Sequence, residues 1–129
     1  GTLLDEIAGI LSSGGVINAA YDQIFCPMVI SDLVDIIINL QLCQITGIIN
    51  VCGPEIWSRH QLALEIAKAM DINPDKVKKV SLDEIGLGGR PKNTSMKINR
   101  LLKVTDSKFT PIKKSIEEVA KNWKEKIEE

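Results

Sequence analysis

The sequence is poor in the residues that most often build a complete active site. Its 129 residues contain one histidine, His60, one tyrosine, Tyr21, and three cysteines far apart in the chain, Cys26, Cys43 and Cys52. A zinc site of cysteine and histidine ligands is not expected, because such sites need several ligands at short spacings. With no C-x-x-C pair and an odd number of cysteines, we expect buried, reduced thiols in a cytoplasmic protein.

The chain also lacks a strong net charge and a long apolar run. The formal net charge is −1, so no global field favours nucleic acid or an anionic membrane surface as a partner. The richest apolar run, LVDIIINLQL, is interrupted by Asp35 and Asn39 and falls short of the roughly 18 residues that a membrane span needs. Apolar residues still make up 44% of the chain, which is enough for one domain with a real core.

Two motifs of nicotinamide-dependent enzymes are missing as well. Dinucleotide-binding folds place a glycine-rich turn between a strand and a helix, and the nearest candidate is GLGGR at residues 86–90. No strongly apolar strand precedes it and no long helix follows directly, so we predict a plain turn. A tyrosine acid is commonly activated by a lysine one helical turn later, which lowers its pKa, but Phe25 stands at that spacing from Tyr21. The sequence therefore contains no complete active site.

Hydrophobic periodicity and turn residues predict alternating helices and strands. Three helices are predicted from capping-box patterns, in which a serine or threonine and a polar side chain one turn later cap the helix reciprocally. The three patterns are Thr2 with Asp5, Ser58 with Gln61, and Ser115 with Glu118. Ser31 is predicted to cap another helix, with Leu33, Ile36, Ile37 and Leu40 inward and Asp32, Asp35 and Asn39 outward.

Short apolar or β-branched runs predict the strands. GIINVCG, residues 47–53, is bounded by glycines and is predicted to be a buried strand. The other segments predicted to be extended are 16–22, 23–27 and 76–80, and 95–103 is predicted to be a short helix. The alternating order indicates an α/β domain.

The stretch GGRPKN, residues 88–93, holds the most informative side chains. Pro91 fixes its own φ and biases Arg90 toward an extended conformation. Gly88 and Gly89 permit backbone angles that other residues avoid. The backbone at Arg90 is therefore predicted to hold a defined conformation, so that Arg90 does not lie on a mobile loop end.

The order of these elements resembles the C-terminal part of the extended short-chain dehydrogenase/reductase family, and most closely its dTDP-4-dehydrorhamnose reductases. The residues that carry the resemblance are, in chain order, Asp22, Gln23, Pro27, Asp32-Leu33-Val34, GIINVCG, the Ser58-capped helix, and RPKNTSM. Phe25 and Met28 depart from it, since the reductases usually have glycine and threonine there. The resemblance implies an α/β C-terminal substrate-binding lobe without the N-terminal Rossmann cofactor core, with residues 1–129 forming a single domain.

The resemblance also implies a nucleotide-sugar site and no catalytic residue in this chain. Arg90 would contact the diphosphate, which suits a guanidinium that is always charged and can bond phosphate oxygens in pairs. The alternative is an arginine–carboxylate pair that fixes the loop. Asn93 would donate an amide hydrogen bond or close the loop as a turn residue. Gln23 and Pro27 would line the substrate pocket.

The implied whole protein is an NAD(P)-dependent sugar-nucleotide oxidoreductase acting on a dTDP-sugar. NAD(P)H would then bind in the full-length enzyme, to an N-terminal cofactor domain that this chain lacks, and not to this chain alone. A homodimer is a further expectation. Two other interpretations stay open: a non-catalytic regulatory module like the β subunit of methionine adenosyltransferase, and part of another sugar-nucleotide epimerase or dehydratase.

Overall fold

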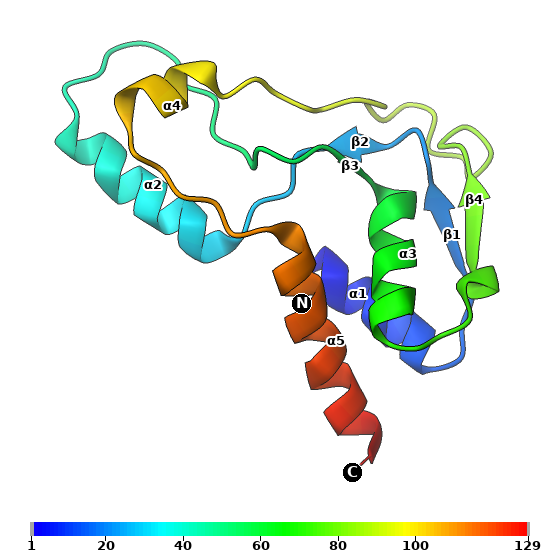
Figure 1. Cartoon of the computed structure of the whole chain (residues 1–129). Coiled ribbons are helices and arrows are strands. Elements are labelled where there is room, and N and C mark those ends of the chain that lie inside the picture. Colours follow the sequence, from blue (N-terminus) through cyan, green and yellow to red (C-terminus); the bar gives the residue numbers. More distant parts are fainter. Residues whose placement is uncertain (1, 129) are drawn as a thin grey trace.

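The computed structural model describes residues 2–128, in which helices and short strands alternate (Figure 1). In chain order the elements are α1 (Leu3–Ser12), β1 (Ile17–Ala20), β2 (Ile24–Phe25), α2 (Ile30–Leu42), β3 (Trp57–Ser58), α3 (Arg59–Ala69), β4 (Val77–Val80), α4 (Asn99–Val104) and α5 (Ile112–Glu128), with a 3-10 turn at Pro74–Lys76 before β4. No helix in this part of the chain is long and apolar enough to cross a membrane.

Two pairs of strands organise the chain. β1 and β4 are parallel neighbours, with Ile17 opposite Val77 at one end of the register. β2 and β3 form a separate antiparallel pair, in which Phe25 lies opposite Trp57. Parallel strands require a long crossover, and here the connection from β1 to β4 contains both α2 and α3 (Figure 1). The predicted α/β class is confirmed.

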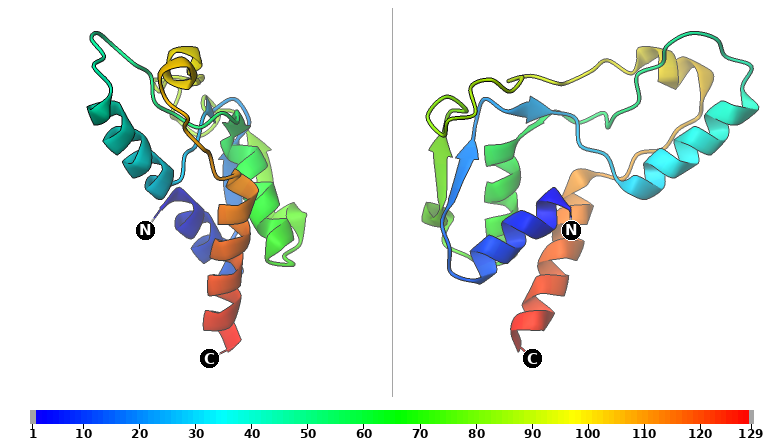
Figure 2. Two further views of the ribbon diagram at one scale, coloured as in Figure 1. Left: turned by 60° about the vertical axis from the view of Figure 1, so that its left-hand side comes forward. Right: turned by 180° about the vertical axis from the view of Figure 1, so that it is seen from behind.

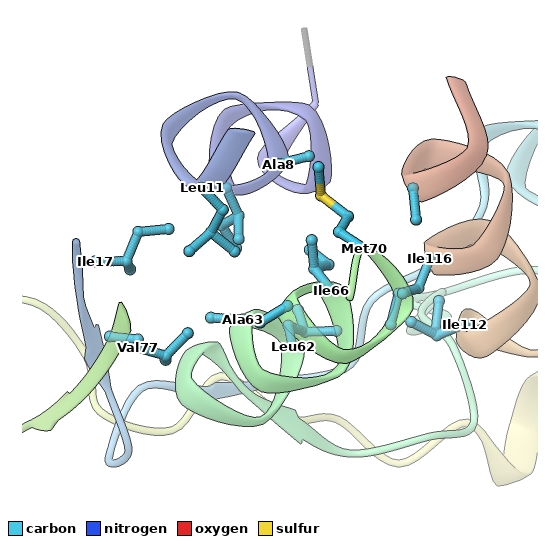
Figure 3. Close-up of a cluster of buried hydrophobic side chains, with 14 residues drawn as sticks. Ala8, Leu11, Ile17, Leu62, Ala63, Ile66, Met70, Val77, Ile112 and Ile116 are labelled. Atoms are coloured by element: carbon cyan, nitrogen blue, oxygen red, sulfur yellow. The ribbon is translucent and has the colours of Figure 1, made fainter. Parts of the chain in front are cut away.

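The main core lies between the β1–β4 pair and the helices α1, α3 and α5 (Figure 3). Ile17 and Ala19 point from one face of β1 into this core, whereas on the other face Asn18 is exposed and Ala20 is buried. α3 occupies the centre, and its Ile66 is completely buried. Gly9 of α1 leaves room for Trp123 of α5, because a Cβ there would lie 3.2 Å from the indole ring.

A second, smaller cluster joins α2 to α4, away from the β1–β4 pair (Figure 2). Its buried members are Ile36, Cys52, Ile98 and Leu101. The predicted inward face of α2 was too broad, because Ile36 is buried but Ile37 is 46% exposed. The predicted Ser31 cap was also wrong. The helix begins at Ile30 after Val29, which offers no side-chain hydrogen bond as a cap.

The predicted strand at residues 47–53 is not formed. Ile48 is 87% exposed, and no strand within residues 2–128 pairs with this segment. Side chains from the α4 region hold its backbone instead, since the Arg100 guanidinium donates to the carbonyl oxygens of Thr46 and Ile48. A β-branched sequence favours a strand only where a neighbouring backbone completes the hydrogen-bond ladder.

The predicted start of the last helix was wrong as well. α5 begins at Ile112, and Ser115 lies inside the helix. The Ile112 N–H donates to Glu55 Oε1 at 3.1 Å, so a side chain far back in the sequence satisfies this helix end. The other two capping boxes, at the starts of α1 and α3, are confirmed with both reciprocal hydrogen bonds present.

Candidate functional site

The RPKN segment, residues 90–93, runs beside β2, and backbone hydrogen bonds join the two. The Ile24 N–H donates to the Lys92 carbonyl at 2.7 Å, and the Thr94 N–H donates to the Ile24 carbonyl at 2.9 Å. Ile24 and Asn93 thereby form a parallel bridge next to the β2–β3 pair. This pairing fixes where Arg90 and Pro91 lie relative to β2.

A cavity of about 320 Å³ opens where this segment meets β2 and the start of α3. Its lining brings together Gln23 and Arg90, two of the residues singled out in the sequence, and also Phe25. The remaining lining residues are Leu3, Arg59, Pro91 and Thr94. Two arginines and no acidic side chain are among these lining residues, and although Glu6 pairs with Arg59, the positive charge of Arg90 favours an anion.

Arg90 lines this cavity and belongs to an exposed loop. Its side chain is exposed, and no hydrogen bond or ion pair of the guanidinium occurs among the described residues. Its backbone N–H donates to the Leu87 carbonyl at 2.9 Å, which closes a turn. The alternative of an Arg90–carboxylate pair that fixes the loop therefore finds no support in this part of the chain.

Lys92 makes the ion pairs that stabilise the loop. Its Nζ lies 2.6 Å from Asp83 Oδ2 and 3.2 Å from Asp22 Oδ2. The hydrogen bonds to Asp83 and Asp22 raise the pKa of Lys92. Burial raises the pKa of Asp22, but hydrogen bonds from the Leu82 N–H and Lys92 outweigh it, so the net shift is downward. Asp22 thereby connects the end of β1 with Leu82 and with the loop that carries Lys92.

The glycines of the loop have different roles from those predicted. Residues 83–90 form successive turns, and the positive φ lies at Gly86, at 72°, not at Gly88 or Gly89. At Gly88 a Cβ would lie 2.4 Å from Asp83 Oδ1, the end of an exposed side chain that would have to rotate away. GLGGR is therefore a turn with no strand-to-helix junction.

Two of the predicted site residues lie outside the cavity lining. The Asn93 Oδ1 accepts hydrogen bonds from the N–H of Ser95 at 2.9 Å and from its hydroxyl at 2.7 Å, so Asn93 closes a local turn. Pro27 faces Gly53, where an added Cβ would lie 1.9 Å from the Pro27 carbonyl oxygen. Met28 likewise packs against the small cluster beside α2 rather than lining the cavity.

Arg59 is the lining residue that the sequence did not reveal. It is the first residue of α3, and its backbone N–H donates to the Gln23 carbonyl at 3.1 Å. Its Nη2 lies 2.9 Å from Glu6 Oε1 on α1. The sequence pattern predicted only the helix start at this point. Nothing in it indicated that Arg59 lies beside Arg90.

The histidine and tyrosine lie at a different cavity, of about 490 Å³, lined by residues including Tyr21, Trp57, His60 and Lys79. Burial lowers the pKa of His60, and the charge of Lys79 lowers it further. The Lys79 ammonium lies 5.0 Å from the centre of the Tyr21 ring, which is a cation–π distance. His60 is half-buried and makes no side-chain hydrogen bond within residues 2–128.

The cysteines are free thiols in this structure. Cys52 is buried, whereas Cys26 and Cys43 are half-buried. Burial raises the pKa of Cys52, and the neighbouring Cys26 raises it further. Across the described part of the chain, no group of three or more histidine, cysteine, aspartate or glutamate side chains is arranged to hold a metal ion.

The parallel β1–β4 pair, its three packed helices and the RPKN segment beside β2 define the class of the fold. It is a mixed α/β fold in which three helices pack against a small parallel sheet. The chain belongs to the RmlD substrate binding domain family, whose model matches residues 2–125. The family resemblance inferred from the sequence is thereby confirmed. No curated protein matches the chain significantly.

Two solved structures share this fold. The dTDP-4-dehydrorhamnose reductase from Yersinia enterocolitica superposes with a TM-score of 0.76 at 17% sequence identity. The dTDP-4-dehydrorhamnose reductase (rfbD) from Bacillus anthracis strain Ames, solved in complex with NADP, gives a TM-score of 0.73 at 21% identity. Each alignment covers 95% of this chain but 43% of the reductase, so the chain spans less than half the length of these proteins.

Proposed function

We propose that this chain is the nucleotide-sugar-binding portion of an NAD(P)-dependent enzyme like dTDP-4-dehydrorhamnose reductase. Membership of the RmlD substrate binding domain family and the fold shared with two such reductases support it. The observation that carries the proposal to this chain is Arg90, which lines the cavity together with Gln23 and whose guanidinium has no hydrogen-bond or ion-pair partner within residues 2–128. Gln23 supplies polar groups at the same wall.

Arg90 would hold the diphosphate of a dTDP-sugar. A guanidinium stays charged at every physiological pH and can donate two parallel hydrogen bonds to one phosphate group. The backbone pairing of Lys92 and Thr94 with Ile24 fixes the segment that carries Arg90, so little ordering is required when a ligand binds. Asn93, already bonded to Ser95, would act by shaping the loop, and Pro27 by shaping the chain beyond β2.

The cofactor is proposed to belong to the rest of the enzyme. The described residues do not fit a dinucleotide, because the only glycine-rich segment forms turns without a following helix and Tyr21 has no lysine one turn later. The complete enzyme would reduce a keto group of the dTDP-sugar with NAD(P)H, and this chain would hold the substrate. The chain alone is not expected to bind NAD(P)H or to catalyse the reduction.

Binding of dTDP to the 129-residue chain tests this function. We expect dTDP to raise the melting temperature, because a ligand that binds only the folded state stabilises it by mass action. Arg90→Ala should abolish the shift. Lys97→Ala is the matched control, since it removes one exposed positive charge from the same segment outside the cavity. A dTDP response that survives Arg90→Ala, or one that Lys97→Ala removes equally, would contradict the assigned site.

The exposed side of α2 supports a further part of the proposal. Its apolar side chains Ile30, Val34, Ile37, Ile38 and Leu42 are between 46% and 81% exposed. An apolar surface of this extent normally marks an interface. Because the related reductases are more than twice as long as the aligned region, we infer that the remainder of the enzyme, carrying the cofactor, covers this side of α2.

The mass of the natural polypeptide tests this partner. A product of at least about twice this length, in which α2 amides exchange more slowly than in the 129-residue chain, would support the missing cofactor half. A natural product of this length would contradict it. A dimer of the 129-residue chain that Leu42→Glu dissociates would instead assign the surface to a second copy.

A regulatory binding module is the second candidate, because the same exposed α2 surface would also suit a protein partner. The two functions differ in their response to nucleotide. Protection of the chain by dTDP against heat, lost in Arg90→Ala, is expected only for the nucleotide-sugar-binding portion.

A further inference from the structure

Arg59 and Arg90 line the same cavity from different elements of the fold. Arg59 begins α3, whereas Arg90 precedes the segment that pairs with β2. Gln23 connects them, because it lines the cavity and its carbonyl accepts the Arg59 N–H. The positions of the two arginine backbones are therefore both fixed relative to β2.

The two guanidinium groups differ in what they contact. Arg90 has no hydrogen-bond or ion-pair partner within residues 2–128, whereas Arg59 lies 2.9 Å from the Glu6 carboxylate. The side chains of this pair are 26% and 57% exposed. An ion pair so accessible to water is weak, because solvent screens the attraction and the side chains lose freedom. A ligand with more negative charge than one carboxylate can displace Glu6.

We propose that Arg59 is a second diphosphate-binding residue, which exchanges Glu6 for one phosphate group while Arg90 binds the other. This inference rests on the proposed nucleotide-sugar function. A diphosphate offers two phosphate groups, and each guanidinium can bond one of them through paired hydrogen bonds. A monophosphate leaves one arginine without a ligand. The arrangement therefore selects nucleoside diphosphates over nucleoside monophosphates.

Titration calorimetry of the 129-residue chain with dTDP, dTMP and thymidine tests the inference. The wild-type chain should bind dTDP more tightly than dTMP. Arg59→Ala should lower the affinity for dTDP about tenfold and the affinity for dTMP by less than about threefold. The preference for the diphosphate over the monophosphate should therefore decrease. Arg59→Lys should retain part of the preference, because it keeps the charge but loses the paired geometry. Glu6→Gln should tighten dTDP binding, because the competing carboxylate is gone.

A second ion pair provides the matched control. Lys113 on α5 and Glu65 on α3 lie 3.8 Å apart outside the cavity. Lys113→Ala and Glu65→Gln make the same changes of charge and should leave the dTDP preference unchanged. Circular dichroism of each variant verifies that it is folded.

The binding results for these variants distinguish the role of Arg59 from the proposed nucleotide-sugar function. If Arg90→Ala weakens dTDP binding while Arg59→Ala and Glu6→Gln have no effect, the role of Arg59 is overturned and the proposed function stands. If the wild-type chain does not bind dTDP, both are overturned. If Lys113→Ala weakens dTDP as much as Arg59→Ala does, the effect is one of net charge and the role of Arg59 is overturned.

Discussion

Asp32, near the start of α2, accepts two hydrogen bonds from Thr110, 78 residues further along the chain. The Thr110 N–H lies 2.6 Å from Asp32 Oδ2, and the Thr110 hydroxyl lies 2.9 Å from Oδ1. Thr110 precedes α5, which belongs to the main core. This pair therefore connects α2 with the main core, although α2 itself packs against the smaller cluster.

Asp32→Ala should loosen α2 more than the rest of the molecule. Loss of two hydrogen bonds to a charged acceptor should lower the free energy of unfolding by about 1.5–3 kcal/mol. Asp35→Ala, on the same helix but exposed, should change it by less than about 0.5 kcal/mol. Urea denaturation gives the two free energies, and hydrogen exchange should show faster opening of residues 30–42 in Asp32→Ala only. Equal exchange in the two variants would contradict the proposed connection.

Gly53→Ala should be strongly destabilising. Its Cβ would lie 1.9 Å from the Pro27 carbonyl oxygen, which is backbone and cannot rotate away. We expect a loss of about 3 kcal/mol or more in unfolding free energy. Gly89→Ala is the control, since a Cβ there has no neighbour within 4 Å. A similar denaturation midpoint for both variants would show that the chains at Pro27 and Gly53 separate easily.

The ion pairs of Lys92 predict a dependence of stability on pH. The pKa of Asp22 is lowered in the fold, so its contribution is present above about pH 4 and is lost as the pH falls through the lowered pKa. The pKa of Lys92 is raised, so its contribution is present below about pH 10 and is lost as the pH rises through the raised pKa. Lys92→Met should remove the alkaline loss and reduce the acid loss, measured as urea midpoints across pH. If Lys92→Met lost stability at alkaline pH as the wild-type chain does, the alkaline loss would belong to another titratable group.

Ser58→Ala and Ser115→Ala should have opposite effects on stability. Ser58 caps α3 through the Gln61 N–H and is buried, so its loss should cost about 1 kcal/mol. Ser115 lies inside α5, where alanine is the better helix former, so its replacement should be neutral or slightly stabilising. Thermal unfolding of the two variants measures both effects. If Ser115→Ala were destabilised, the result would support the capping role that the sequence pattern predicted for Ser115.

Local signals in the sequence were sufficient for much of the fold. The Thr2 and Ser58 capping boxes satisfy their own helix ends, and the strand at 76–80 and the extended segment at 16–22 contain β4 and β1. The same capping pattern failed at Ser115, because Glu55 supplies a hydrogen bond at the actual start of α5 from 57 residues away. A pattern of nearby residues cannot report a partner so distant.

At the candidate site, too, local sequence patterns did not reveal contacts between residues that are distant in the chain. Gln23 and Arg90 were identified through the family resemblance and do line one cavity, whereas Arg59 enters it only because β2 pairs with β3 at the start of α3. Its contact with Glu6 spans 53 residues. The predicted strand at 47–53 failed for a related reason, because its sequence favours an extended chain but no strand within residues 2–128 lies beside it.

The pairing of Ile24 with Lys92 and Thr94 has a mechanical consequence. Both backbone polar groups of Ile24 are bonded to the segment that follows Arg90, and Gln23 and Phe25 flank Ile24 on either side. The two walls of the cavity are therefore parts of one hydrogen-bonded ribbon. A backbone movement that carries Lys92 and Thr94 away from β2 would have to break these hydrogen bonds, so the frame that carries Arg90 is tied to the wall that carries Gln23.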